Sequence, residues 1–482
     1  MASSLKRKAV KGISWNLLER FGVQGMSFIM GIIMARLLTP EAYGLIGMIV
    51  VFFAIAEVFV RSGFGEAYVQ KKEVTDVDAN TVFFTNFLIS VLLYIILYYS
   101  APAISRFYEE PKLIGLTRIM GLMIIINAFN VIQRAQISRN LNFKRKTKIT
   151  LISTMASGLA GITAAFYGFG VWSIVIQRMG NRLFTTSGLW ITSKWTPNYQ
   201  VSKASFKSMF SFGSWLLFSN ILREIFNNIY KLTIGKFFPA AQLGYYTKAK
   251  SFQEIASRQW TQAVSSVSFP VFSQVQDDKQ RLQQAMSRFL THTMVFIMPL
   301  MITLLVVAEP FVMLLLTEKW APMIPFLQLL CIVGFLYPLH SVNVQVLLAQ
   351  GKSQLNFNLA MIKNGLRVLN IIVMYRYGVI YIIIGEVVLS FIALLINTYY
   401  TKKMIDYGFI KQIRDIAKIA IGAFLAGIIT FGFSLLFDNY WVHLFGGTVL
   451  SFGLFASIQY IINRKLFLEI IDLKNFFNKQ KQ

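Results

Sequence analysis

Charged side chains interrupt several long apolar stretches of this sequence, and they are its strongest candidates for chemistry. A charge in the middle of a membrane-spanning helix costs roughly 2.5 to 3.5 kcal/mol, so it needs an oppositely charged partner, water or a ligand. Basic side chains in such places favour an anionic group such as a phosphate or pyrophosphate. The candidate substrate-binding residues are Arg20, Arg178, Arg223, Lys250, Arg258, Lys363 and Arg367.

Two pairs of cations have no acid within helical reach in their own segment. Arg178 and Arg182 are four residues apart, as are Lys363 and Arg367, and no Asp or Glu stands three or four residues from either pair. Cations therefore exceed acids within the apolar stretches. This excess predicts a cationic cavity that water or an anionic ligand occupies.

Four acids in the same stretches are candidates for ion coupling, namely Glu19, Glu57, Glu224 and Glu254. A plainer interpretation is that Glu57 pairs with Arg61, and Glu254 with Arg258, as salt bridges within one helix. Arg61, Arg182 and Arg258 stand close to expected cytoplasmic ends, where a long side chain reaches the membrane surface.

Lys250, Glu254 and Arg258 recur every fourth residue, which places all three on one face of a helix as a ladder. Glu386 is a further lone acid, and packing could equally hold it as a neutral carboxyl. These residues leave both a ligand-binding and a structural interpretation open.

Metal, redox and nucleotide chemistry have little support. One cysteine and three scattered histidines give no metal-ligand spacing, and we expect no cofactor. Asp76 and Asp78 form a D-x-D motif that could hold a metal and a nucleotide sugar, but Thr75 and Asp76 more plausibly cap a helix. The net charge of +26 does not indicate nucleic acid, because the basic residues form no soluble face with interleaved aromatic residues.

Composition identifies an integral membrane protein, since no globular core could bury a chain that is 55% hydrophobic. A spanning helix needs roughly 20 apolar residues. We therefore expect an all-α membrane protein of about fourteen transmembrane helices. The expected spans are about 10–36, 43–62, 80–104, 113–133, 149–167, 169–192, 208–234, 241–268, 286–308, 321–349, 354–375, 378–399, 416–437 and 441–463.

Lys and Arg concentrate in every second loop, which predicts that both termini lie in the cytoplasm. The stretches expected on the cytoplasmic side are Lys6–Lys11, Lys71–Lys72, Arg134–Lys148, Lys194–Lys207, Lys279–Arg288, Lys352, Lys402–Lys418 and Arg464–Lys481. The opposite loops hold few basic residues, among them Lys112 and Arg376.

An internal repeat relates two hydrophobic hairpins about 200 residues apart. Its matched pairs are Ser14 and Ser214, Trp15 and Trp215, Arg36 and Lys236, Gly44 and Gly244, and Phe52 and Phe252. Because six spans separate the copies, they insert in the same orientation and predict two six-helix lobes around a central cavity. The expected domains are a first lobe at 1–199, a second at 200–400, and a helix pair with an amphipathic cytoplasmic tail at 401–482.

Short motifs follow one another along the chain. They are Gly-x-x-Trp at Gly12–Trp15, Ala-Arg-x-Leu-x-Pro-x-x-Tyr-Gly at Ala35–Gly44, Gly-Phe-Gly-x-Ala at Gly63–Ala67 before Val69-Gln70, Gln-Arg-Ala at Gln133–Ala135, Gly-Phe-Gly-Val-Trp at Gly168–Trp172 and Lys-Trp-Ala-Pro at Lys319–Pro322. In this order and spacing they resemble the polysaccharide-transport branch, with its Wzx-type flippases, of the multidrug, oligosaccharidyl-lipid and polysaccharide (MOP) exporter superfamily.

The resemblance implies a two-lobe exporter of the bacterial inner membrane. Its cargo would be a lipid-linked oligosaccharide, carried by undecaprenyl pyrophosphate, for O-antigen, capsule or exopolysaccharide biosynthesis. Its partners would be that cargo, membrane lipids and glycan polymerase or export machinery. Relatives often carry an acid where this chain has Tyr230, so an ion-coupling role at that position does not transfer.

Other classes remain open at this point. A drug or cation exporter of the same superfamily would need acids and aromatic residues in its cavity, whereas this chain offers mostly bases. A lipid II flippase differs only in its cargo. A membrane glycan polymerase or glycosyltransferase would need a large outer loop or a nucleotide-binding domain, and a passive assembly subunit would not need so many charges within its spans.

Overall fold

The computed structural model describes residues 2–61, 64–71, 73–140, 142–203, 205–207, 220–464 and 466. Every secondary-structure element within these ranges is a helix. The first part of the expected span at 208–234, residues 208–219, and nearly all of the expected amphipathic tail lie outside the described residues. The all-helical prediction is confirmed for the rest of the chain.

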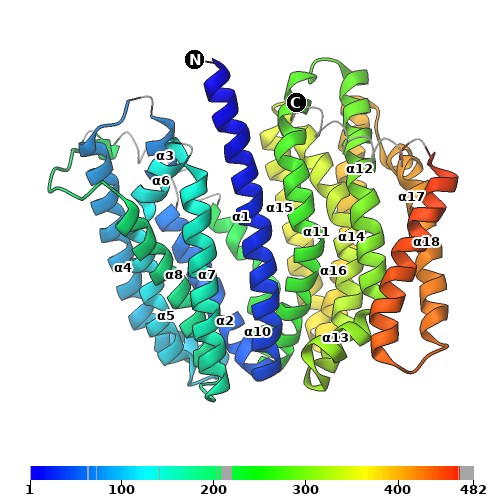
Figure 1. Ribbon diagram of the computed structural model, residues 1–482, viewed down its shortest axis with the longest axis horizontal. Coiled ribbons are helices and arrows are strands. Elements are labelled where there is room, and N and C mark those ends of the chain that lie inside the picture. The colour runs from blue at the N-terminus through cyan, green and yellow to red at the C-terminus, as the bar shows by residue number, and fades with distance from the viewer. Residues whose placement is uncertain are drawn as a thin grey trace. The chain divides into compact units, whose positions relative to one another are not determined.

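The chain forms two compact units, Met1–Gly244 and Tyr245–Gln482. The first unit contains α1 (Ala2–Leu37), α2 (Pro40–Arg61), α3 (Phe64–Gln70), α4 (Asp76–Tyr108), α5 (Leu113–Ala128), α6 (Val131–Arg139), α7 (Phe143–Phe166), α8 (Val171–Thr192) and α10 (Ile229–Phe237). Within it, α7 packs against α1 and α8, and α5 packs against α4 and α2 (Figure 1).

The second unit begins within α11 (Ala240–Gln274). It continues through α12 (Lys279–Val306), α13 (Ala308–Leu316), η1 (Glu318–Met323), α14 (Ile324–Ala349), α15 (Ser353–Met374), η2 (Tyr375–Tyr377), α16 (Val379–Ile405), α17 (Phe409–Ser434), η3 (Val442–Gly446) and α18 (Gly447–Ile462). Leu282, Met286 and Leu290 recur every fourth residue along α12 and lie in its core. The pair α17 and α18, orange to red in Figure 1, packs on α12 and so belongs to this unit.

Nine helices among the described residues are long and apolar enough to cross a membrane, or ten if the pair α5 and α6 is one span bent by 40°. Helices cover all the expected spans outside the undescribed segments, but a total of fourteen spans stays a prediction. The helices α1, α8 and α11 have 36, 22 and 35 residues and are not among these nine. They carry the candidate charges of the first, sixth and eighth expected spans.

The break between α5 and α6 is stabilised by contacts with α8. The side chain of Asn130 is buried at the break and donates to Thr186 of α8 at 2.9 Å, and Trp190 donates to the carbonyl of Phe129 at 2.8 Å. Polar groups of α8 thus satisfy the backbone and side chain where the helix is interrupted, as burial in an apolar layer requires.

Helix ends reproduce the offset of the repeat. The helix α1 ends at Leu37 and α10 at Phe237, while α2 begins at Pro40 and α11 at Ala240. The compact-unit boundary nevertheless falls after Gly244, later than the expected boundary at 199, because α10 packs against α2. The division at 1–199, 200–400 and 401–482 stays a prediction.

Two equivalent glycines make reciprocal contacts within the first unit. A Cβ atom added to Gly44 would lie 1.8 Å from the carbonyl oxygen of Ala240, and one added to Gly244 would lie 2.0 Å from that of Pro40. Gly44 thus contacts Ala240, and its repeat equivalent Gly244 contacts Pro40, the repeat equivalent of Ala240. Such a reciprocal pair of contacts is the pattern of a two-fold related interface.

The D-x-D motif is part of a helix cap. Thr75 is the N-cap of α4, and the acid that completes its capping box is Asp78 rather than Asp76. Asp78 also accepts from Lys71 at 2.7 Å and from Ser205 at 2.8 Å, so structural partners occupy its carboxylate. The prediction that Thr75 caps the helix is confirmed. The acid that caps it together with Thr75 is Asp78, not Asp76 as predicted.

Candidate functional site

An ion pair between α2 and α8 lies within the first unit. Arg182 Nη2 donates to Glu57 Oε1 at 2.6 Å, and Arg182 Nη1 donates to Asn127 of α5 at 3.4 Å. The expectation that Arg182 reaches the membrane surface is therefore wrong, because Glu57 and Asn127 hold it inside the unit. The alternative partner of Glu57, Arg61, has its side chain outside the described residues.

Arg178 lies one helical turn before Arg182 and faces a small cavity. The cavity has a volume of about 160 Å³, and Glu57, Arg178 and Arg182 supply its charge. Its other walls are apolar side chains such as Phe53 and Met120. Arg178 is exposed and makes no hydrogen bond or ion pair with any residue that the structure describes. Two guanidinium groups thus face one carboxylate, leaving the cavity cationic.

Glu19 of α1 is held by α7. Its Oε1 atom lies 3.1 Å from Lys146 Nζ and accepts a hydrogen bond from Thr150 at 3.4 Å. Its Oε2 atom is buried and has no hydrogen-bond partner within the described part of the chain. The neighbouring Arg20 is partly buried. The partner of Glu19 thus comes from the basic segment Arg134–Lys148, more than a hundred residues along the chain.

Arg223 and Glu224 stand near the middle of the seventh expected span, in its described part. Arg223 is exposed, and among the described residues it has neither a hydrogen bond nor an ion pair. Glu224 accepts a hydrogen bond from the side-chain amide of Asn228 at 3.4 Å. Lys231 donates to Oδ1 of Asn228 at 3.0 Å. Tyr230 is buried.

In the second unit, Lys250 of α11 pairs with Glu386 of α16. The distance from Lys250 Nζ to Glu386 Oε1 is 2.6 Å, and Tyr246 donates to Glu386 Oε2 at 3.4 Å. Glu386 is therefore not a lone acid. The charge of Lys250 has a partner, which weakens its assignment as a substrate-binding residue.

The expected ladder on α11 divides into two parts. Glu254 pairs with Arg258 at 3.4 Å, and both side chains are more than one third exposed, whereas Lys250 turns to Glu386. The salt-bridge interpretation of Glu254 and Arg258 is thus confirmed.

Lys363 and Arg367 of α15 contact neutral groups. Lys363 Nζ donates to Asn397 Oδ1 of α16 at 3.1 Å, and Arg367 Nη1 donates to Asn364 Oδ1 at 3.1 Å. Asn397 in turn contacts His340 of α14, 3.2 Å away. No carboxylate of the described residues pairs with either cation, so this cluster is cationic as well.

The partners that sequence reasoning missed are Asn127, Lys146, Asn364 and Asn397. The asparagines could have been found from the sequence, because an asparagine amide within an apolar helix needs a hydrogen-bond partner. The pairing itself depends on which faces of different helices meet, which a one-dimensional pattern does not encode.

A model of the family described as "Polysaccharide biosynthesis protein" matches residues 33–325, more than half of the chain. The chain belongs to this family. The match includes α2, α8 and α11, which carry Glu57, Arg178 and Lys250.

Curated relatives carry related names. The teichuronic acid biosynthesis protein TuaB of Bacillus subtilis is 26% identical over 73% of this chain and 74% of its own length. The lipopolysaccharide biosynthesis protein WzxC of Escherichia coli is 24% identical over 75% and 74%. The succinoglycan biosynthesis transport protein ExoT of Rhizobium meliloti is 27% identical over 70% and 69%.

Solved structures show the fold. The lipid II flippase MurJ has a TM-score of 0.76 at 15% identity, covering 95% of this chain and 99% of its own. A multidrug resistance MATE family transporter of the MOP superfamily has a TM-score of 0.63 at 13% identity, covering 81% and 98%. The protein is a multi-pass membrane protein with the fold of MOP superfamily transporters, as the motifs predict.

Proposed function

We propose that the protein is a flippase that carries a lipid-linked oligosaccharide from the cytoplasmic to the outer leaflet of the bacterial inner membrane. The carrier lipid would be undecaprenyl pyrophosphate, and the glycan would serve O-antigen, capsule or exopolysaccharide biosynthesis. Family membership and the names of the curated relatives support this cargo class.

The observation that carries the proposal is the excess of cations within spanning helices. Arg178 faces a cavity with two guanidinium groups and one carboxylate, and Lys363 and Arg367 contact only neutral side chains among the described residues. An apolar surrounding strengthens the attraction of such groups for a phosphate. Cationic drugs would be repelled, which counts against a drug exporter.

In the proposed mechanism, Arg20, Arg178, Arg223, Lys363 and Arg367 neutralise the pyrophosphate along a polar path, while the polyprenyl tail stays in the bilayer. Alternating exposure of this path to the two membrane faces moves the head group. Lys250 and Arg258 would contribute only when their ion pairs with Glu386 and Glu254 open.

For ion coupling we retain Glu19, Glu57, Glu224 and Glu254. Glu57 borders the cationic cavity, and protonation of its carboxylate would release Arg182 for the anionic cargo. Binding of a proton and binding of the cargo would then be linked through one ion pair.

The experiment replaces Arg178 or Arg367 by Gln in cells whose export depends on this protein. Lipid-linked glycans are extracted, identified by mass spectrometry and assigned to a leaflet by enzymatic labelling from outside. We expect each variant to be present at normal abundance and to accumulate the pyrophosphate-linked glycan in the cytoplasmic leaflet.

Lys403→Gln serves as the control, because it removes an exposed charge at the end of α16. Normal export by both Arg178→Gln and Arg367→Gln would contradict the proposed binding residues. Accumulation of lipid II instead would assign a different cargo, and accumulation in the outer leaflet would indicate a polymerase.

A further inference from the structure

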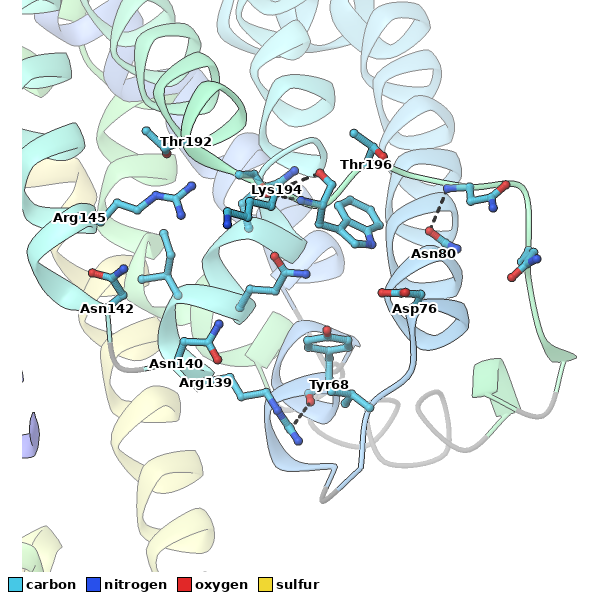
Figure 2. A pocket seen from close by; sticks show the side chains of 18 residues that line it. Tyr68, Asp76, Asn80, Arg139, Asn140, Asn142, Arg145, Thr192, Lys194 and Thr196 are labelled. Carbon is cyan, nitrogen blue, oxygen red and sulfur yellow. Dashed lines mark hydrogen bonds between the residues drawn. The ribbon is translucent and has the colours of Figure 1, made fainter. Parts of the chain in front are cut away.

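A second cavity lies at one end of the first unit and is separate from the charged groups described above. Its volume is about 810 Å³. Figure 2 shows side chains around it from the start of α4, the end of α6, the start of α7 and the segment after α8. The lining residues are Tyr68, Val74, Asp76, Asn80, Gln133, Gln136, Ile137, Arg139, Asn140, Asn142, Arg145, Thr192, Ser193, Lys194, Trp195, Thr196, Asn198 and Gln200.

This wall is rich in amides and hydroxyls, which both donate and accept hydrogen bonds. In Figure 2, Asn140 and Asn142 lie on one side of the cavity and Asn80 on the other. Burial raises the pKa of Tyr68, so its hydroxyl stays a donor at neutral pH. Such a surface matches a ligand with many hydroxyl groups, as a sugar has.

Gln133 is the least expected part of this wall. The residue is 2% exposed, yet neither its Oε1 nor its Nε2 atom has a hydrogen-bond partner among the residues that the structure describes. A buried primary amide without partners is destabilising, so its position in the cavity wall points to a ligand that satisfies it. The Nε atom of Arg145 is also buried, with no partner in the described ranges.

The charge of the cavity is positive. Arg145 and Lys194 face one exposed acid, Asp76, and Lys194 forms no hydrogen bond or ion pair with the part of the chain that the structure describes. Arg139 is already engaged, because its Nη1 atom donates to the backbone carbonyls of Val69 and Lys71 at 3.3 and 2.5 Å. Arg145 is engaged through Nη2 only, which donates to the backbone carbonyl of Leu189 at 3.5 Å. Among the described residues, the other N–H groups of Arg145 and the amino group of Lys194 therefore remain to meet an anionic group.

The loop that closes the cavity is well fixed. The backbone N–H of Asn198 donates to Asn80 Oδ1 at 3.0 Å, and that of Ser202 donates to Thr81 Oγ1 at 3.1 Å. Trp195 packs edge-on against Phe83, with ring centroids 5.7 Å apart. The segment after α8 is thus docked on α4, and this docking holds Lys194 and Trp195 at the cavity.

We propose that this cavity binds a phosphorylated sugar, with Arg145 and Lys194 on the phosphate and Gln133, Asn80 and Asp76 on sugar hydroxyls. The basic stretches that border it are all expected on the cytoplasmic side. If the proposed flippase function holds, the ligand is the glycosyl phosphate head of the cargo before transport. The same chemistry belongs to a soluble nucleotide sugar.

The test uses the purified full chain in nanodiscs and glucose 1-phosphate as the probe, measured by isothermal titration calorimetry. We expect saturable binding that is stronger than that of glucose or inorganic phosphate. Arg145→Gln, Lys194→Gln and Gln133→Leu should each weaken binding by about tenfold or more, the loss expected for a hydrogen bond to a charged group. Lys148→Gln, which removes a nearby exposed charge outside the cavity, should change it by less than about twofold.

Lys194 lies in an exposed loop, so its substitution tests the site even if Gln133→Leu fails to fold. Absence of saturable binding, or equal weakening by Lys148→Gln and Lys194→Gln, would overturn the proposal. Competition experiments distinguish a lipid head group from a soluble ligand. Displacement of glucose 1-phosphate by a polyprenyl phosphate-linked sugar placed in the nanodisc identifies the lipid head group as the ligand. Displacement by UDP-glucose alone identifies a soluble ligand. Arg178→Gln should bind the probe normally, so this test is independent of the export assay.

Discussion

The charged residues of the spanning helices fall into two groups by their partners. Ion pairs join Glu57 to Arg182 and Lys250 to Glu386, both at 2.6 Å and both between different helices. Arg178 has no such partner among the described residues. The paired charges fix helix positions, and the unpaired charge is free to meet a ligand, so substitutions in the two groups should have different effects.

Glu386→Gln should destabilise the second unit by about 3 kcal/mol, in the range for removing one partner of a buried ion pair. The reason is that Lys250 would keep its charge in a largely buried position with only a neutral amide to contact. Thermal unfolding of the purified protein in detergent measures this effect as a lower Tm.

Glu254→Gln is the matched control, since its pair with Arg258 is exposed and worth at most about 0.5 kcal/mol. The double variant Lys250→Met with Glu386→Gln should recover part of the loss. A Tm equal to that of the unsubstituted protein for Glu386→Gln would show that the ion pair does not stabilise α16 against α11.

At the scale of elements, the first turns of α2 and α11 approach each other through glycine. Backbone atoms occupy the places that a side chain on Gly44 or Gly244 would need, and backbone cannot move aside as the end of a flexible side chain can. The repeat thus uses the same residue twice for the same physical reason.

We expect Gly44→Val and Gly244→Val to be similarly harmful, each costing about 2 kcal/mol or more through overpacking. Gly25→Ala and Gly365→Ala are controls within helices, because nothing lies within 4 Å of a Cβ atom added at either position. These controls should be neutral or slightly stabilising. Yield and Tm of the purified variants provide the comparison, and a normal Tm for either valine variant would refute the close contact.

At the scale of the whole molecule, orientation in the membrane depends on the distribution of Lys and Arg among the loops. The chain has one cysteine, Cys331, and it is fully buried. Single cysteines introduced into exposed loops can therefore be labelled against a low background.

Lys112→Cys and Tyr377→Cys should react with a membrane-impermeant maleimide on intact cells, whereas Lys194→Cys and Lys403→Cys should react only after permeabilisation. All four positions are exposed, so a difference in labelling reports the membrane side. Labelling of Lys194→Cys on intact cells would reverse the topology and would place the 810 Å³ cavity on the outer side.

The sequence by itself predicts the helices because the length of an apolar run is a local property. The observed helices α7 at Phe143–Phe166 and α14 at Ile324–Ala349 lie close to the expected spans at 149–167 and 321–349. The break after Ala128 was not predictable in this way, because it depends on Trp190 and Thr186 of another helix.

The sequence alone also showed that cations exceed acids within the spans and that two hairpins repeat, since both are counts along the chain. Only the tertiary structure decided which acid each cation meets. Glu57 and Arg182 are 125 residues apart, and Lys250 and Glu386 are 136 apart. Their contact depends on how two helices are packed and rotated about their axes, and a rotation of one residue, about 100°, would separate them.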